Sequence, residues 1–136
     1  MLSVMASSRK QFRPDAVPEA KTPIKYLTEN GFSIIRLSDL DPSAINIPGE
    51  SRFIVQNEQD REREIKVSFS KDLIARLRIR RRGALSDTSM FWLVCAESCL
   101  AKYLWGKNDY PPEGRLTVTE LSPDELMLAI HWRDRE

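Results

Sequence analysis

The chain has 136 residues, of which 41% are hydrophobic and 30% are charged, and its net charge at pH 7 is +1. These values are typical of a single small globular domain with its own core. The longest apolar run, 90–96, has seven residues, which is far short of the roughly 20 that a membrane-spanning helix needs. The composition therefore argues against a membrane protein.

The small net charge conceals an uneven distribution of charged residues along the chain. Residues 51–107 carry twelve basic and seven acidic side chains, a net charge of +5, whereas residues 108–136 carry three basic and seven acidic ones, a net charge of −4. A basic segment of this kind indicates contact with nucleic acid or with an acidic protein. It is equally compatible with pairing between the two parts of the chain.

The two cysteines indicate a reducing compartment. Cys95 and Cys99 lie four positions apart in an apolar segment, so on a helix they share a face and cannot easily form a disulfide. The sequence shows neither a disulfide framework nor a secretory leader, and we expect a cytoplasmic protein.

The domain is expected to begin after a short tail. Residues 1–21 are polar, contain two prolines and lack periodicity, so they are predicted to be disordered, and residues 22–136 form the single domain. Pro23 suits the first turn of a helix over 23–30. The apolar stretch 32–37 is a strand candidate, and the segment that follows is a proline-rich loop with one helical turn.

Two segments alternate between apolar and polar residues with the period of two that indicates strands. They are 52–57, with Phe53 and Val55, and 63–69, where Lys66 separates two apolar residues. The polar stretch between them predicts a β-hairpin.

Residues 71–81 fit either a helix or a strand. As a helix, the segment would be capped by Ser70, and Leu73, Ile74 and Leu77 would form one apolar stripe. As a strand, it would alternate leucine and isoleucine with arginine. The run 72–75 favours the helix.

Residues 87–105 are the clearest helix in the sequence. Ser86 or Asp87 can cap its start, and Gly106 can end it. Apolar residues cover half of its circumference or more. We expect such a helix to be buried against more than one layer, or to pack on the core with one face and on another chain with the other.

The last segment is ambiguous in the same way. Leu116 and Val118 alternate with threonines, and 126–132 shows a period of two, which together predict a second hairpin around a turn at Ser122 and Pro123. The alternative is a helix capped by Ser122. With the hairpin, the elements predict an α+β fold, in which a mainly antiparallel sheet of two β-hairpins packs on the long apolar central helix, with shorter helices around it.

Few residues are suited to catalysis or metal binding. His131 is the only histidine, and Cys95 and Cys99 do not form a CxxC pair. Glycine-rich phosphate loops are absent from the sequence. We therefore expect no catalytic residue, no metal and no cofactor. An enzyme would require His131 beside a carboxylate in a pocket.

The clearest functional signal is the stretch RLRIRRRG, residues 76–83. Arginine binds phosphates and carboxylates through paired hydrogen bonds, so the stretch indicates a contact with nucleic acid or an acidic protein. At 100° per residue its arginines would spread around a helix, which is typical of a solvated helix end. The candidate binding residues are Lys66, Arg76, Arg78, Arg80, Arg81 and Arg82.

The order of strand, basic helix, glycine turn and long helix around this stretch resembles the ribbon-helix-helix family of DNA-binding proteins. The resemblance covers about forty residues, 65–104. It implies a strand that pairs with its twin in a homodimer and places Lys66 and Ser68 in the major groove. The chain departs from this pattern in its short first helix, its long apolar second helix, and the expected place of the strand in an intrachain hairpin.

Two functions are therefore expected for a small intracellular binding protein. The first is a nucleic-acid-binding regulator that uses the arginine-rich segment. The alternative is a protein–protein interaction module, of adaptor or inhibitor type, whose basic centre contacts an acidic partner, and which exposes aromatic residues such as Trp105 and Tyr110. A homodimer is compatible with either function.

Overall fold

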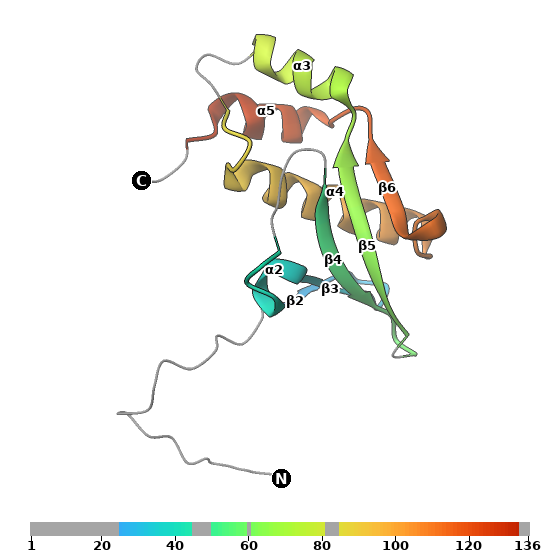
Figure 1. Cartoon of the computed structure of the whole chain (residues 1–136). Helices are drawn as coiled ribbons and strands as arrows, with labels where there is room; N and C mark the ends of the chain where they lie inside the picture. The colour runs from blue at the N-terminus through green and yellow to red at the C-terminus, as the bar shows by residue number, and fades with distance from the viewer. Residues whose placement is uncertain (1–24, 45–49, 60, 81–84, 134–136) are drawn as a thin grey trace, which may run out of the picture.

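The chain forms a single α+β domain, as the sequence predicts, with one sheet covered by helices on one face (Figure 1). In the part of the chain that the structure describes, no helix is both long and apolar enough to cross a membrane. The tail expected at residues 1–21, together with Arg81 and Arg82, lies outside the described residues. The computed structural model describes residues 25–44, 50–59, 61–80 and 85–133.

The described strands form one five-stranded sheet in the order β2–β3–β4–β5–β6. The first four pair antiparallel, and β6 pairs parallel with β5. A parallel neighbour requires a long crossover, and here the crossover contains two helices, α3 (Lys71–Arg80) and α4 (Met90–Lys107). The strands are β2 (Lys25–Leu27), β3 (Ser33–Arg36), β4 (Ser51–Gln56), β5 (Glu62–Phe69) and β6 (Arg115–Val118).

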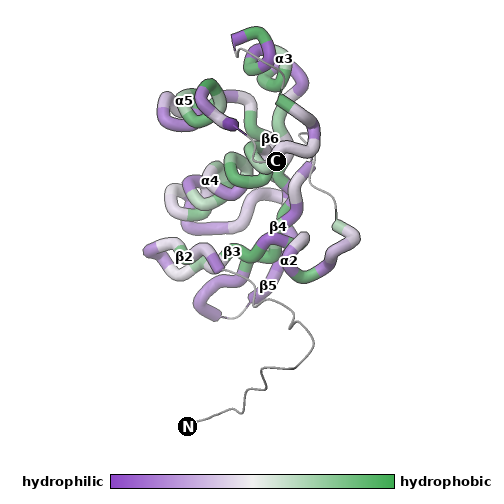
Figure 2. The backbone as a smooth tube through the Cα atoms, turned by 90° about the vertical axis from the view of Figure 1, so that its left-hand side faces the viewer, coloured by the Kyte–Doolittle hydropathy of each residue, from purple (hydrophilic) through white to green (hydrophobic). Residues whose placement is uncertain are grey.

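The sheet packs one face against α4 (Met90–Lys107), which is the long central helix expected from the sequence. Figure 2 shows the hydrophobic stretches of α4 turned toward the sheet. The hairpin of β4 and β5 is confirmed, and its buried and less buried residues alternate along β4 and the second half of β5. The fully buried side chains between the sheet and α4 include Phe53, Val55, Ile65, Val67, Trp92, Leu100 and Leu104.

The caps of α4 differ from the expected ones. Ser89, and neither Ser86 nor Asp87, accepts the hydrogen bond from the first turn, so the helix begins three residues later than predicted. Gly106 lies inside the helix, which ends at Asn108 in the left-handed conformation that often terminates helices.

Two shorter helices, α3 (Lys71–Arg80) and α5 (Pro123–His131), lie beside each other at the end of the sheet where β5 and β6 finish (Figure 1). The helical alternative for 71–81 is confirmed, and Ser70 caps α3 by accepting from the Leu73 amide at 3.1 Å. The single turn α2 (Leu37–Leu40) lies in the segment where one helical turn was expected.

The helix predicted over 23–30 is wrong, because Lys25–Leu27 form the strand β2, which pairs with β3. A tertiary contact explains the difference. Asn30 lies in the turn between β2 and β3, and its side-chain amide donates to the carbonyl of Leu104 at 3.0 Å. This carbonyl belongs to the last turn of α4 and also accepts from the Asn108 amide. The same Asn30 amide reaches the Trp105 carbonyl at 3.5 Å, at the helix end where backbone acceptors lack partners within the helix. The turn therefore serves as a cap for a distant helix.

The second hairpin is also wrong, because the segment after β6 forms α5. Ser122 and Glu125 make a reciprocal capping box, in which each side chain accepts from the backbone amide of the other residue. Pro123 occupies the first helical turn, where its missing N–H costs nothing. The helix start signal therefore outweighs the period-two pattern.

Candidate functional site

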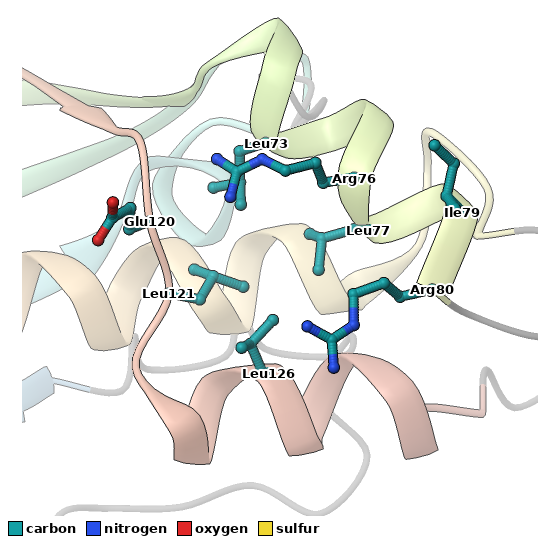
Figure 3. A pocket seen from close by; sticks show the side chains of 8 residues that line it. All are labelled: Leu73, Arg76, Leu77, Ile79, Arg80, Glu120, Leu121 and Leu126. Atoms are coloured by element: carbon teal, nitrogen blue, oxygen red, sulfur yellow. The ribbon is translucent and has the colours of Figure 1, made fainter.

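The α3–α5 groove is the candidate site, because it brings part of the arginine-rich segment over an apolar floor. It encloses about 290 Å³ between the two helices and the segment that precedes α5 (Figure 3). Eight side chains line it: Leu73, Arg76, Leu77, Ile79, Arg80, Glu120, Leu121 and Leu126.

The floor of the groove is made of leucines from both sides. Leu73 and Leu77 of α3 are buried, whereas Leu121 and Leu126 from the α5 side are only partly buried. On the rim, Ile79 is 82% exposed, which is unusual for so large an apolar side chain. The groove thus presents apolar surface that the described residues leave uncovered.

Two arginines of α3 lie one helical turn apart and extend over this floor (Figure 3). The guanidinium of Arg76 is held in place by Asp72, with Nε to Oδ2 at 3.0 Å, and by the carbonyl of Thr119, also at 3.0 Å. Among the described residues, Arg80 has neither a hydrogen-bonding nor an ion-pair partner. One guanidinium is therefore anchored while the other remains available to an acidic ligand.

The remaining predicted site residues do not join this groove. Arg78 pairs with Asp87 at 2.5 Å, so it points to a different side of α3. The predicted spread of arginines around the helix is thus found only in part, because Arg76 and Arg80 share the groove and Arg78 lies apart from them. Arg81 and Arg82 lie outside the described residues.

Lys66 lies on the face of the sheet that α4 does not cover, in a row with Arg52 of β4 and Arg115 of β6. Two acids accompany this row, because Arg52 contacts Glu50 at 2.6 Å and Glu64 at 3.7 Å. Lys66 and the α3 arginines therefore belong to separate surfaces, and the row around Lys66 carries mixed charge.

The strand that the ribbon-helix-helix resemblance would place in DNA is not free to pair with a twin. β5 lies between β4 and β6 and is paired with both. The homodimer implied by that resemblance, with paired β5 strands, is excluded by this topology. The parallel strand β6 covers the edge that a partner would have used.

A second polar cluster joins α4 to the start of α5. The buried carboxylate of Glu125 accepts from Lys102 Nζ at 3.0 Å, and Lys102 also contacts Ser122 Oγ at 3.1 Å. A serine beside a lysine can act in nucleophilic catalysis if the lysine is unprotonated. Here the hydrogen bond that Lys102 donates to the Glu125 carboxylate raises the pKa of Lys102, which keeps the amine protonated. The arrangement therefore stabilises the helix junction.

Sequence reasoning did not identify Glu125, although the pattern Ser122–x–x–Glu125 is a helix start signal. Its neighbour Cys99 contacts the same carboxylate at 3.5 Å. Cys95 is buried and Cys99 half-buried, and both are free thiols. Within the described ranges, no three His, Cys, Asp or Glu side chains come together as a metal site.

The other residues considered from the sequence lie apart from the groove. His131 is exposed in the last turn of α5, on a helix where a strand was expected. Trp105 is exposed, as anticipated, but Tyr110 is half-buried. The ring of Tyr110 packs edge-on against Phe32, and its hydroxyl donates to the carbonyl of Arg61, so it supports the β4–β5 turn.

Comparison with known proteins gives no further guide to the site. No protein-family model matches the chain, and no curated protein or solved structure is significantly similar to it.

Proposed function

We propose that the protein is a small binding module whose α3–α5 groove holds an acidic, apolar segment of a partner protein. The observation that carries this proposal is the combination of a leucine floor with the guanidinium of Arg80 above it, which has no hydrogen-bonding or ion-pair partner among the described residues. An apolar side chain of the partner would fill the groove, and a carboxylate nearby would pair with Arg80. Such a mixture of apolar anchor and arginine is typical of the residues that dominate protein–protein binding.

The same geometry fits a protein better than it fits a nucleic acid. Phosphate contacts need basic side chains along a surface, and they gain nothing from a leucine-lined hollow or from the exposed Ile79. Of the three described α3 arginines, Arg76 and Arg78 already pair with Asp72 and Asp87. The unbridged cysteines support a reducing, cytoplasmic setting for this interaction.

The test is selection of a random peptide display library on the purified protein, followed by affinity measurement for the enriched peptides. We expect enriched sequences to combine a bulky apolar residue with Asp or Glu within one helical turn of it. Arg80→Glu should weaken binding about tenfold or more, equivalent to about 1.4 kcal/mol. The matched control is Arg78→Glu, which makes the same charge change on the same helix outside the groove, and it should leave affinity within about twofold.

The nucleic-acid function remains the competing prediction. DNA binding by the unmodified protein and by a variant with fewer arginines distinguishes it from the protein-binding function. A phosphate-binding surface would retain duplex DNA at low salt, with a log–log salt slope of about −0.9 for each phosphate contacted. Changing Arg80, Arg81 and Arg82 together to Gln would flatten that slope by up to about three units. Enriched peptides without acidic residues, together with such DNA retention, would overturn the protein-binding proposal.

A further inference from the structure

The α3–α5 groove has opposite charges at its two ends. Glu120 lies just before α5, and Arg80 is the last residue of α3. Both side chains are exposed, and neither has a hydrogen-bonding or ion-pair partner among the described residues. Figure 3 shows Leu121 and Leu126 between these two side chains. A ligand on the leucine floor therefore meets an acid at one end and a base at the other.

The two helices that line the groove leave the sheet together and run in the same general direction (Figure 1). The backbone amide of Ser70, just before α3, donates to the carbonyl of Val118, at the end of β6, at 2.9 Å. Both helices therefore begin near Glu120, and α3 ends at Arg80. Because a helix is positive at its N-terminus and negative at its C-terminus, the dipoles of α3 and α5 point the same way.

Each of these helices carries acids at its start and bases at its end, as its own dipole favours. α3 has Asp72 in its first turn and Arg80 in its last. α5 has Asp124 in its first turn and His131 in its last. When helices of this pattern lie antiparallel, their unlike ends meet, whereas parallel helices bring like ends together. A third helix in the groove is therefore favoured when it runs antiparallel to both.

The spacing of the two charges also fits a helix. The guanidinium of Arg76 donates to the carbonyl of Thr119, next to Glu120, at 3.0 Å. Arg80 lies one turn, about 6 Å, further along α3. On a ligand helix, the complementary charges would thus lie one turn or more apart, with apolar residues on the same face between them.

We propose that the partner segment is an amphipathic helix that lies antiparallel to α3 and α5, with acids in its first turn and bases in its last. This inference rests on the proposed function, because it names the form and direction of the segment that the groove holds. The first-turn acids pair with Arg80, and the last-turn bases pair with Glu120. The same charges stabilise the partner helix by itself. In the opposite direction, this helix would place like charges together at both ends.

The experiment is selection of a display library of helical peptides on two proteins, the unmodified chain and the double variant Arg80→Glu with Glu120→Lys. On the unmodified protein, we expect enriched peptides to carry Asp or Glu before their apolar anchors and Lys or Arg after them. The double variant should shift the selection toward the reverse order. Any bias of the library toward peptides that are helical by themselves is the same in both selections, so the shift reports the charges of the groove.

Fluorescence anisotropy then measures the affinities of the most enriched peptide and of its form with the two charged ends exchanged. The enriched form should bind the unmodified protein about fivefold tighter or more, as expected for two exposed ion pairs replaced by repulsions. This preference should weaken in about 1 M salt, where charges are screened beyond about 3 Å. The matched control is Arg78→Glu with Glu62→Lys, which makes the same charge changes outside the groove and should keep the preference. Circular dichroism should show both double variants folded.

A nitroxide label on the bound peptide tests the direction itself. A label at the N-terminus of the peptide should broaden the NMR signals of amides around Arg80 more than those around Glu120, and a label at its C-terminus should do the opposite. The reverse pattern, or a charge order that the double variant selects unchanged, would refute the antiparallel helix and leave the proposed function in place. A selection that enriches no peptide on the unmodified protein would refute both.

Discussion

Arg36 of β3 and Glu97 of α4 join the sheet to the central helix through two parallel hydrogen bonds, Nε to Oε2 at 3.1 Å and a terminal nitrogen to Oε1 at 3.0 Å. The contact lies at the border of the core, and both side chains are largely withdrawn from solvent. The hydrogen bond to Glu97 also raises the pKa of Arg36. Paired bonds between charged groups are among the stronger polar contacts in proteins.

We expect Glu97→Gln to lower the free energy of unfolding by roughly 1–3 kcal/mol, because the substitution leaves the Arg36 guanidinium without its countercharge. Urea unfolding followed by circular dichroism measures this loss. The control is Glu64→Gln, which removes an exposed ion-pair partner of Arg52. That change should cost less than about 1 kcal/mol. Equal losses for the two variants would mean that the Arg36–Glu97 contact is no stronger than a surface pair.

The packing of α4 predicts a larger effect at its centre. Leu100 is fully buried between the sheet and the helix layer, so Leu100→Ala should cost about 2–5 kcal/mol in urea melts. Met127→Ala on α5, where the side chain is mostly exposed, should stay within about 0.5 kcal/mol. A loss at Leu100 as small as that at Met127 would contradict the core described here.

The sequence was sufficient where a local pattern and the final environment agree. β4, β5 and α4 carry strong periodicity, and each of them is buried on the face that the period indicates. The sequence was insufficient where the structure of a segment depends on a contact with residues far away in the chain. The turn at Asn30 is determined by the carbonyls at the end of α4, more than seventy residues away, and no local window contains that information.

The candidate site, too, was predictable from the sequence only in part. The arginines were visible in the sequence, but the leucine floor was not, because Leu121 and Leu126 were assigned to a hairpin and not to the approach and first turns of α5. Once Ser122 and Glu125 are read as a capping box, α5 follows, and the groove beside α3 becomes predictable.

The two thiols should be unreactive in the folded protein. Cys95 is buried, and hydrogen bonding to Cys95 and burial raise the pKa of the Cys99 thiol, with a further contribution from the Glu125 carboxylate. Because the thiolate is the reactive form, a thiol reagent should label both residues slowly at neutral pH, and rapidly in urea. Cys95→Ser and Cys99→Ser assign the rates, and the half-buried Cys99 should react first. Rapid labelling of both in the native protein would show that this face of α4 is open.

The Glu125 carboxylate should make stability depend on pH. Burial alone would raise its pKa, but hydrogen bonds from the Ser122 backbone and from Lys102 outweigh burial, so the pKa is lowered. A lowered pKa means that the folded state favours the ionised carboxylate. Its contribution is therefore complete above the unfolded pKa, about 4.3, and is lost as the pH falls through the folded value.

Glu125→Gln should accordingly cost about 1–2 kcal/mol at pH 7, through the weakened cap and the lost pair with Lys102. The difference from the unmodified protein should shrink as urea melts are repeated from pH 7 down to pH 3, because protonation removes the same interactions from the unmodified chain. Glu120→Gln, an exposed change on the rim of the α3–α5 groove, should shift stability by less than about 0.5 kcal/mol at either pH. If the Glu125→Gln difference were constant over this range, the ionised carboxylate would not be the group that holds α5 against α4.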